Sequence, residues 1–111
     1  MGYTNHYLKA IFCASGTAYD ITVCAYLDEP YQGPITGVDI AVYVDGYYFT
    51  IIDETFSVPA GTHTIEVDDW FQIDYGFYLV FLYFDVGTGD NPTTVNVNSD
   101  MTATAHYYLS V

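Results

Sequence analysis

Basic side chains are almost absent from this sequence. Lys9 is the only Lys or Arg, against 14 Asp and Glu, so the formal net charge is −13. Proteins bind nucleic acids and anionic membrane surfaces largely through Lys and Arg, so this composition excludes both classes of partner. The excess of acid predicts a folded monomer that repels its own copies. Divalent-cation binding and adaptation to high salt are the alternatives.

Cysteine and long apolar runs are also scarce. Cys13 and Cys24 are the only cysteines. Their spacing fits neither a zinc site nor Cys-x-x-Cys redox chemistry. The apolar stretch 77–84 is far too short to span a bilayer as a helix. Residues 1–15 lack the basic start and apolar run of a signal peptide. We therefore expect no membrane insertion.

Apolar and aromatic side chains, in contrast, are abundant. Hydrophobic residues make up 51% of the chain and aromatic residues 19%, mainly Tyr and Phe, which favour strands. A chain of 111 residues with this composition buries a core without disulfides or metals. We expect one folded domain over residues 1–111 and not a disordered chain.

Apolar and polar residues alternate along most of the chain, as in strands with one buried face. The expected strands are residues 6–14, 19–27, 38–44, 47–52, 56–67 (broken at Pro59), 77–86, 93–98 and 101–111, and residues 68–76 are expected to be a connection. Asp45-Gly46 is the strongest hairpin signal. The pattern predicts an all-β fold, an immunoglobulin-like β-sandwich of about seven to eight antiparallel strands.

Three blocks of sequence carry a family resemblance. Residues 42–46 read Val-Tyr-Val-Asp-Gly, a strand that ends in Asp-Gly. Residues 56–67 contain the turn and strand Pro-Ala-Gly-Thr-His-Thr-Ile, and residues 95–108 form a closing pair of strands. These blocks resemble the Ig-like surface modules called PEGA domains, and they are similar to the carboxypeptidase-regulatory-like β-sandwiches.

The resemblance implies a noncatalytic Ig-like module of a secreted or cell-surface protein, archaeal or bacterial. Such a module acts in structural assembly or adhesion through protein contacts, and its localisation is extracellular or at the cell surface. Two alternatives stay open. One is a carbohydrate-binding module that uses exposed Tyr and Trp, and the other is a viral or extracellular filament subunit that self-associates through strands.

The residues themselves also indicate no enzyme. None of the serines lies in a nucleophile motif, and the acids fall mostly in turns, where Asp is favoured for backbone reasons. The three histidines, His6, His63 and His106, lie on separate expected strands, so we expect no metal site. His63 shares the phase of the apolar residues on its strand, which predicts an inward side chain hydrogen-bonded near the turn 59–61.

Calcium is the one cofactor that the acids support, because it prefers clustered oxygen ligands from loops. The candidate clusters are Asp28-Glu29, Asp53-Glu54, Asp68-Asp69, and Asp85 with Asp90. None matches the EF-hand loop, and turn chemistry alone accounts for acids at such positions. We therefore expect no bound cofactor.

A disulfide between Cys13 and Cys24 is predicted. A hairpin centred between Ala18 and Tyr19 places the two cysteines directly opposite each other on adjacent strands. An extracellular setting favours the bridge. The alternative is two small buried thiols.

Exposed aromatic residues and the last strand are the expected binding elements. The chain has too many aromatic side chains to bury all of them, and the candidates for a binding surface are Tyr47, Tyr48, Trp70, Tyr107 and Tyr108. A protein partner, self-association or carbohydrate fits such a surface. The strand 101–111 alternates cleanly and lacks Pro and Lys, so we expect an edge that accepts a neighbour's strand. The alternative is an interior strand.

Overall fold

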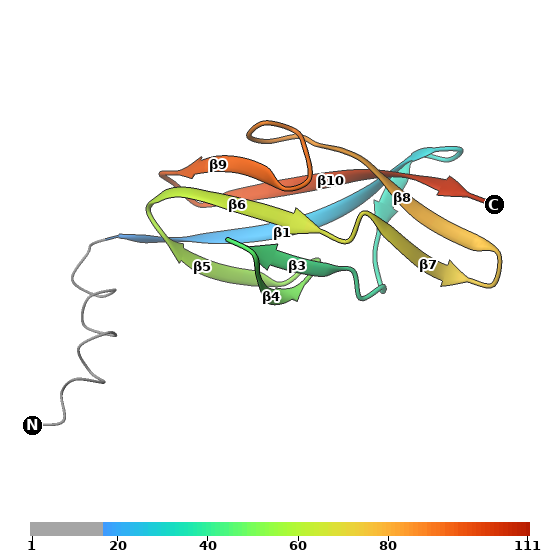
Figure 1. Cartoon of the computed structure of the whole chain (residues 1–111), viewed down its shortest axis with the longest axis horizontal. Helices are drawn as coiled ribbons and strands as arrows, with labels where there is room; N and C mark the ends of the chain where they lie inside the picture. Colours follow the sequence, from blue (N-terminus) through green and yellow to red (C-terminus); the bar gives the residue numbers. More distant parts are fainter. Residues whose placement is uncertain (1–16) are drawn as a thin grey trace, which may run out of the picture.

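The computed structural model describes residues 17–111, which form ten strands and no helix (Figure 1). The strands are β1 Ala18–Glu29, β2 Gly33–Ile35, β3 Ala41–Val44, β4 Tyr47–Ile51, β5 Thr55–Pro59, β6 Gly61–Val67, β7 Trp70–Asp74, β8 Phe77–Phe84, β9 Thr93–Val97 and β10 Met101–Ser110. The described part of the chain thus holds no helix that could cross a membrane. The all-β prediction is confirmed.

The strands form a sandwich of two sheets with a common core. The larger sheet has six strands in the order β2-β1-β10-β8-β7, with β5 also paired to β1. The smaller sheet has four strands in the order β4-β3-β6-β9. The structure has ten strands where about seven to eight antiparallel strands were expected, and one pair, β1 with β10, runs parallel while the other pairs are antiparallel.

The first and last described strands lie side by side in the middle of the larger sheet. β10 pairs with β1 from Ile21↔Met101 to Glu29↔Tyr108 and with β8 on its other side. The last strand is therefore interior, and its predicted role as an open edge is wrong. Alternation shows that a strand has one buried face, but it does not show which strands flank it.

The second edge of β1 is also occupied. β5 pairs with residues 18–22 and β2 with residues 25–27, and between them the Asp53 N–H donates to the Val23 carbonyl at 2.7 Å. No free edge of β1 is left for the hairpin expected from residues 6–14. That segment and Cys13 lie outside the described residues, so the Cys13–Cys24 disulfide stays a prediction.

The core is built from the apolar rows that the sequence predicts. Ile21, Val23 and Ala25 of β1 face the interior with at most 3% exposure. The buried side chains of the other strands and loops complete one cluster, and they are Ile40, Val42, Val44, Ile52, Val58, Ile65, Val67, Leu79, Phe84, Val95, Val97, Ala103, Ala105 and Tyr107. Alternate side chains of each strand therefore face the space between the two sheets, and these side chains form the core.

Tyr107 is the largest fully buried side chain. It shares the inward face of β10 with Ala103 and Ala105, so its place in the expected binding surface is wrong. Its hydroxyl donates to the carbonyl of half-buried Asp68 at 2.6 Å, which gives the buried hydroxyl a partner. This bond ties the core to the segment that carries the chain from β6 in the smaller sheet to β7 in the larger one.

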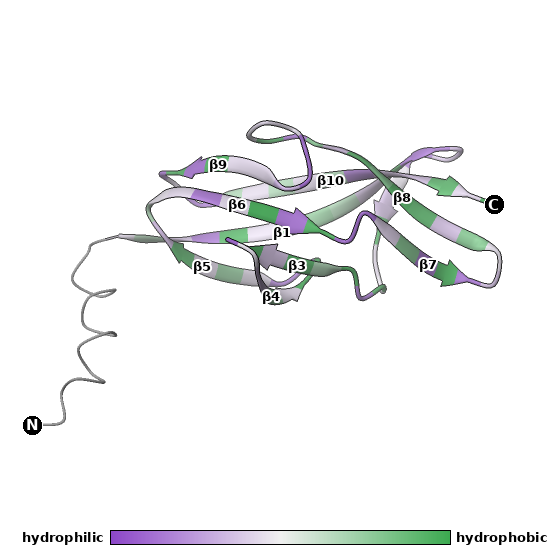
Figure 2. Ribbon diagram, viewed as in Figure 1, coloured by the Kyte–Doolittle hydropathy of each residue, from purple (hydrophilic) through white to green (hydrophobic). Residues whose placement is uncertain are grey.

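A hairpin of β7 and β8 forms one end of the molecule. Residues 70–74, expected as part of a connection, pair instead with β8 along the edge of the larger sheet. The hairpin turn lies at the end of the long axis opposite the start of β1 (Figure 1). Figure 2 shows apolar segments along both strands out to this end.

Candidate binding surface

Residues of the two resembling sequence blocks meet in one hydrogen-bonded cluster. Asp45 begins the β3–β4 turn with a φ of 53°, and its carboxylate accepts from the Thr64 N–H at 3.0 Å and contacts His63 Nδ1 at 2.7 Å. The other ring nitrogen of His63 lies 2.8 Å from the Pro59 carbonyl. The predicted contact of His63 with the turn 59–61 is confirmed. The cluster joins the β3–β4 hairpin turn to the turn between β5 and β6 and is a structural device.

The Asp45–His63 pair shifts the pKa of both side chains. Partial burial by itself lowers the pKa of His63, but the hydrogen bonds to Asp45 and to the Pro59 carbonyl outweigh it, so the pKa is raised. Partial burial raises the pKa of Asp45, but the bonds from His63 and Thr64 outweigh it and lower the pKa. The folded chain therefore favours the charged pair.

A second histidine lies in an aromatic group on the outer face of the larger sheet. His106 pairs in register with Tyr26 of β1 and with Tyr83 of β8. The Tyr83 and His106 rings stack with centroids 4.3 Å apart and an interplanar angle of 6°. Nδ1 of His106 lies 2.7 Å from the Asp28 carboxylate. This bond to Asp28 occupies one of the two ring nitrogens.

Several of the acids proposed as calcium ligands accept hydrogen bonds within the fold. The carboxylate of Asp68 accepts from the Ala41 N–H at 3.0 Å and from the Tyr43 hydroxyl at 3.4 Å. Asp85 accepts from the Thr104 N–H at 2.8 Å. Across residues 17–111, no group of three or more His, Cys, Asp or Glu side chains gathers closely enough to hold a metal.

Exposed aromatic and aliphatic side chains gather at two places. One is β4, which exposes Tyr47, Tyr48 and Phe49 at the edge of the smaller sheet. The other is the β7–β8 hairpin, which carries six of the eleven large exposed hydrophobic residues: Trp70, Ile73, Tyr75, Phe77, Leu82 and Tyr83. We call the four on β7, the turn and the start of β8, namely Trp70, Ile73, Tyr75 and Phe77, the hairpin surface, because Leu82 and Tyr83 lie at the other end of β8. It is the larger of the two apolar surfaces.

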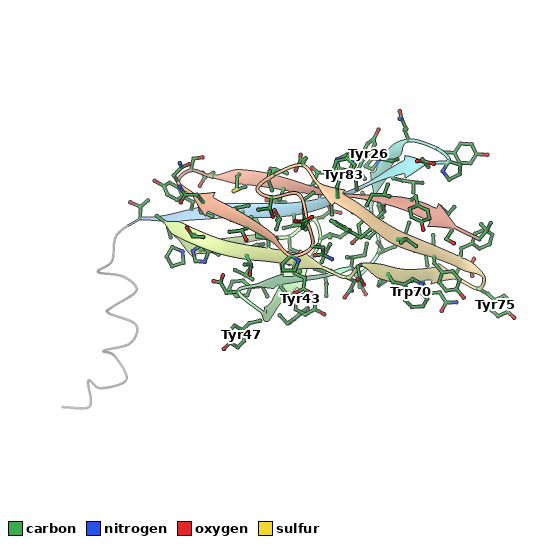
Figure 3. The ribbon with its side chains drawn as sticks, turned by 45° about the horizontal axis from the view of Figure 1, so that its top comes forward. Tyr26, Tyr43, Tyr47, Trp70, Tyr75 and Tyr83 are labelled. Atoms are coloured by element: carbon green, nitrogen blue, oxygen red, sulfur yellow. The ribbon has the colours of Figure 1, made fainter. Side chains whose placement is uncertain are left out.

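The hairpin surface is apolar on both faces of its sheet. Trp70 stacks on Tyr78 on the outer face, with ring centroids 4.9 Å apart, and remains 56% exposed. Phe71 pairs with buried Leu79 on the inner face and packs against the core. Tyr75 projects from the turn with 92% of its side chain exposed (Figure 3). Soluble monomers seldom expose so much aromatic surface in one place.

The expected surface residues have different fates. Tyr47, Tyr48 and Trp70 are 74%, 63% and 56% exposed, whereas Tyr108 is half-buried opposite Val80. Sequence reasoning missed Ile73, Tyr75, Phe77 and Leu82 as exposed residues. The turn residues Tyr75-Gly76 between two apolar segments were the available signal for a hairpin there.

Comparison of the chain with protein-family models, curated proteins and solved structures finds no match. The function is therefore argued below from the exposed surfaces of the molecule.

Proposed function

We propose that this chain is a noncatalytic Ig-like module of an extracellular or cell-surface assembly, joined to its partners by protein contacts. The observation that carries the proposal is the hairpin surface, where exposed aromatic residues concentrate at one end of an elongated molecule. Aromatic side chains with an apolar body and a polar tip are enriched in protein interfaces. Protein assembly is the role that this surface fits best.

The resemblance to PEGA-like modules supports the same proposal. The Asp45–His63–Pro59 cluster gives the resembling blocks a structural purpose, because it holds the β3–β4 turn against β6 and against the Pro59 turn, where the chain passes from β5 in one sheet to β6 in the other. A rigid frame positions loops and hairpins for contact. The net charge of −13 opposes close approach of copies, so assembly through this surface requires salt or cations to screen the repulsion.

Carbohydrate binding is the second candidate. The Trp70–Tyr78 stack offers an exposed aromatic face of the kind that packs on sugar rings. A broad sugar platform would also require the Tyr26–His106–Tyr83 group, yet Figure 3 places Tyr26 and Tyr83 apart from Trp70 and Tyr75. The aromatic residues thus form two separate groups, which favours protein contacts over a continuous sugar platform.

Sedimentation velocity of the full chain over a range of protein concentrations in moderate salt tests the proposal. We expect concentration-dependent association by the parent and a marked loss of it in the double variant Trp70→Ser, Tyr75→Ser. The control is Tyr47→Ser, Tyr48→Ser, which removes two equally exposed aromatic side chains from β4. A glycan array on the same proteins tests the second candidate.

A strictly monomeric parent that binds an array glycan through Trp70 would replace assembly by carbohydrate binding. Equal loss of association in both double variants would show that apolar surface in general, and not the hairpin surface, drives the contact.

A further inference from the structure

We infer that residues 6–14 of one copy add as a β-strand to the free edge of β7 in the next copy, so that copies join head to tail. The inference rests on the proposed function and names its partner, a second copy of this chain. Four observations carry it: the occupied edges of β1, the distribution of charge, the chemistry of β7 and the reach of the segment.

The segment has a strand pattern but no edge beside its neighbour in sequence. Residues 6–14 alternate, which predicts a strand, and a short turn at 15–17 would pair it with β1. Both edges of β1 are occupied, by β10 on one side and by β5 and β2 on the other. The segment therefore requires an edge elsewhere.

Charge separates this segment from the rest of the chain. All 14 acids lie within residues 20–100, and the only basic side chain is Lys9. Residues 17–111 carry 14 acids and no Lys or Arg, a formal charge of −14, and residues 1–16 carry +1. Two sandwiches repel each other, whereas the segment is attracted to a sandwich. On charge alone, residues 1–16 approach the acidic sandwich of another copy more easily than a second sandwich does.

β7 offers unpaired backbone groups to such a strand. The Asp69 carbonyl accepts from the Phe81 N–H at 2.9 Å, which makes this a hydrogen-bonded pair of the antiparallel ladder. Hydrogen-bonded and non-bonded pairs alternate along the ladder, so the N–H and C=O of Trp70 and Gln72 point toward the free edge. β7 contains no Pro or Lys, the residues that commonly block an edge.

The side chains match as well. β7 presents Trp70 on the outer face, Phe71 on the inner face and Ile73 at 41% exposure. The segment has apolar side chains in both phases, with Leu8, Ala10, Phe12 and Ala14 in one and Tyr7, Ile11 and Cys13 in the other. In contrast, the free edge strand β9 exposes only Thr94 and Asn96. The other edge strands, β2 and β5, contain Pro34 and Pro59, so the aromatic edge β4 is the remaining rival.

Reach excludes pairing of the segment with β7 of its own copy. Residue 14 lies four residues before Ala18, so it stays within about 14 Å of the start of β1. β7 lies toward the opposite end of a molecule with a long axis of 58 Å (Figure 1). A β7 edge that accepts the segment must therefore belong to another copy. Because donor and acceptor lie at opposite ends, the contact is heterologous and joins successive copies head to tail.

Proline substitution at a free-edge amide tests the inference in the full chain. Gln72→Pro removes the N–H that faces the β7 edge, and Tyr48→Pro removes the corresponding free-edge N–H of β4 as a matched control. Phe12→Asp alters the proposed donor and changes no described residue. Association is measured by sedimentation velocity in moderate salt, and thermal melting of each variant checks its fold.

We expect Gln72→Pro and Phe12→Asp each to weaken association by about tenfold or more, as loss of a central interface contact does, and Tyr48→Pro to match the parent. Hydrogen exchange should show slower exchange in residues 70–74 of the assembled parent than in the dilute monomer. If Gln72→Pro fails to fold, Phe12→Asp and hydrogen exchange still decide.

Two other results are informative. Association that needs the hairpin surface but is unaffected by Phe12→Asp overturns the donor strand and leaves the proposed function standing. Association abolished by Tyr48→Pro and not by Gln72→Pro moves the acceptor to β4 and overturns the inference. A parent that remains monomeric at every concentration removes both the inference and assembly by self-contact.

Discussion

Removal of the charge at Asp45 tests whether the Asp45–His63 cluster stabilises the fold. Asn in place of Asp45 tolerates the positive φ of 53° and still offers an oxygen to the Thr64 N–H. The substitution Asp45→Asn therefore removes the ion pair with His63 and leaves the turn intact. Any loss of stability comes from the charge-assisted part of the contact.

The sign of the pH dependence follows from the two pKa shifts. The raised pKa of His63 contributes stability that is complete below its ordinary value of 6.5 and is lost as the pH rises through the folded value. The lowered pKa of Asp45 contributes above its ordinary value of 3.8 and is lost as the pH falls through the folded value. Both contributions are present between about pH 4 and pH 6.5.

The magnitude is modest because Asp45 is half exposed. The His63 side chain is 15% exposed and that of Asp45 is 48% exposed, so water screens the pair. We expect Asp45→Asn to cost about 1 kcal/mol at pH 5.5 and little at pH 8.5. For a domain of this size, about 1 kcal/mol corresponds to a fall in Tm of roughly 4–8 °C.

Thermal melting at pH 5.5 and pH 8.5 measures the effect. The matched control is Asp53→Asn, at the other non-glycine position with positive φ, because it removes the same charge without a histidine partner in its carboxylate contacts. A double-mutant cycle with His63→Gln isolates the coupling between the two side chains. The His106–Asp28 pair is common to all variants and cancels.

An equal fall in Tm at both pH values would refute the reasoning, because a neutral hydrogen bond or a turn effect would then account for the loss. The same holds if Asp45→Asn and Asp53→Asn behave alike.

Other perturbations test the core, a turn and the charge. Tyr107→Phe should lower stability by about 1–2 kcal/mol in urea unfolding, because the Asp68 carbonyl loses the donor that buried Tyr107 supplies; an unchanged midpoint would contradict this. Gly87→Ala should destabilise far more than Gly76→Ala, since both have positive φ but only at residue 87 would a new Cβ lie 2.3 Å from the Thr94 carbonyl oxygen. Added NaCl should raise the Tm by screening the net charge of −13, and a Tm that falls between low and moderate salt would show that self-repulsion is not the main effect of the acids on stability.

The sequence predicts much of the fold where a strand has one buried face. The row Ile21, Val23 and Ala25 is buried as alternation predicts, and Asp45-Gly46 forms the expected hairpin turn. The position of His63 beside the turn 59–61 was also predictable, because its phase points it inward. These features are local, and local pattern determines them.

Features that depend on tertiary arrangement were not predictable. β7 has only one residue, Phe71, that is not exposed, so its sequence shows no alternation and resembles a connection. The interior place of β10 depends on a parallel pairing with β1 across some 80 residues of chain. The exposure of the hairpin's apolar side chains also depends on tertiary arrangement. The apolar run 77–84 is equally consistent with a central strand that is buried on both faces.

The parallel pairing of β1 and β10 has a mechanical consequence. The two strands carry the described ends of the chain, which leave the sandwich in opposite directions (Figure 1). Tension applied through both ends therefore loads the β1–β10 hydrogen bonds along the strands, in shear, across all eight register pairs at once. Bonds loaded together must break together, whereas those of a hairpin pulled open at its ends break one at a time. The sandwich is built to resist stretching along its long axis.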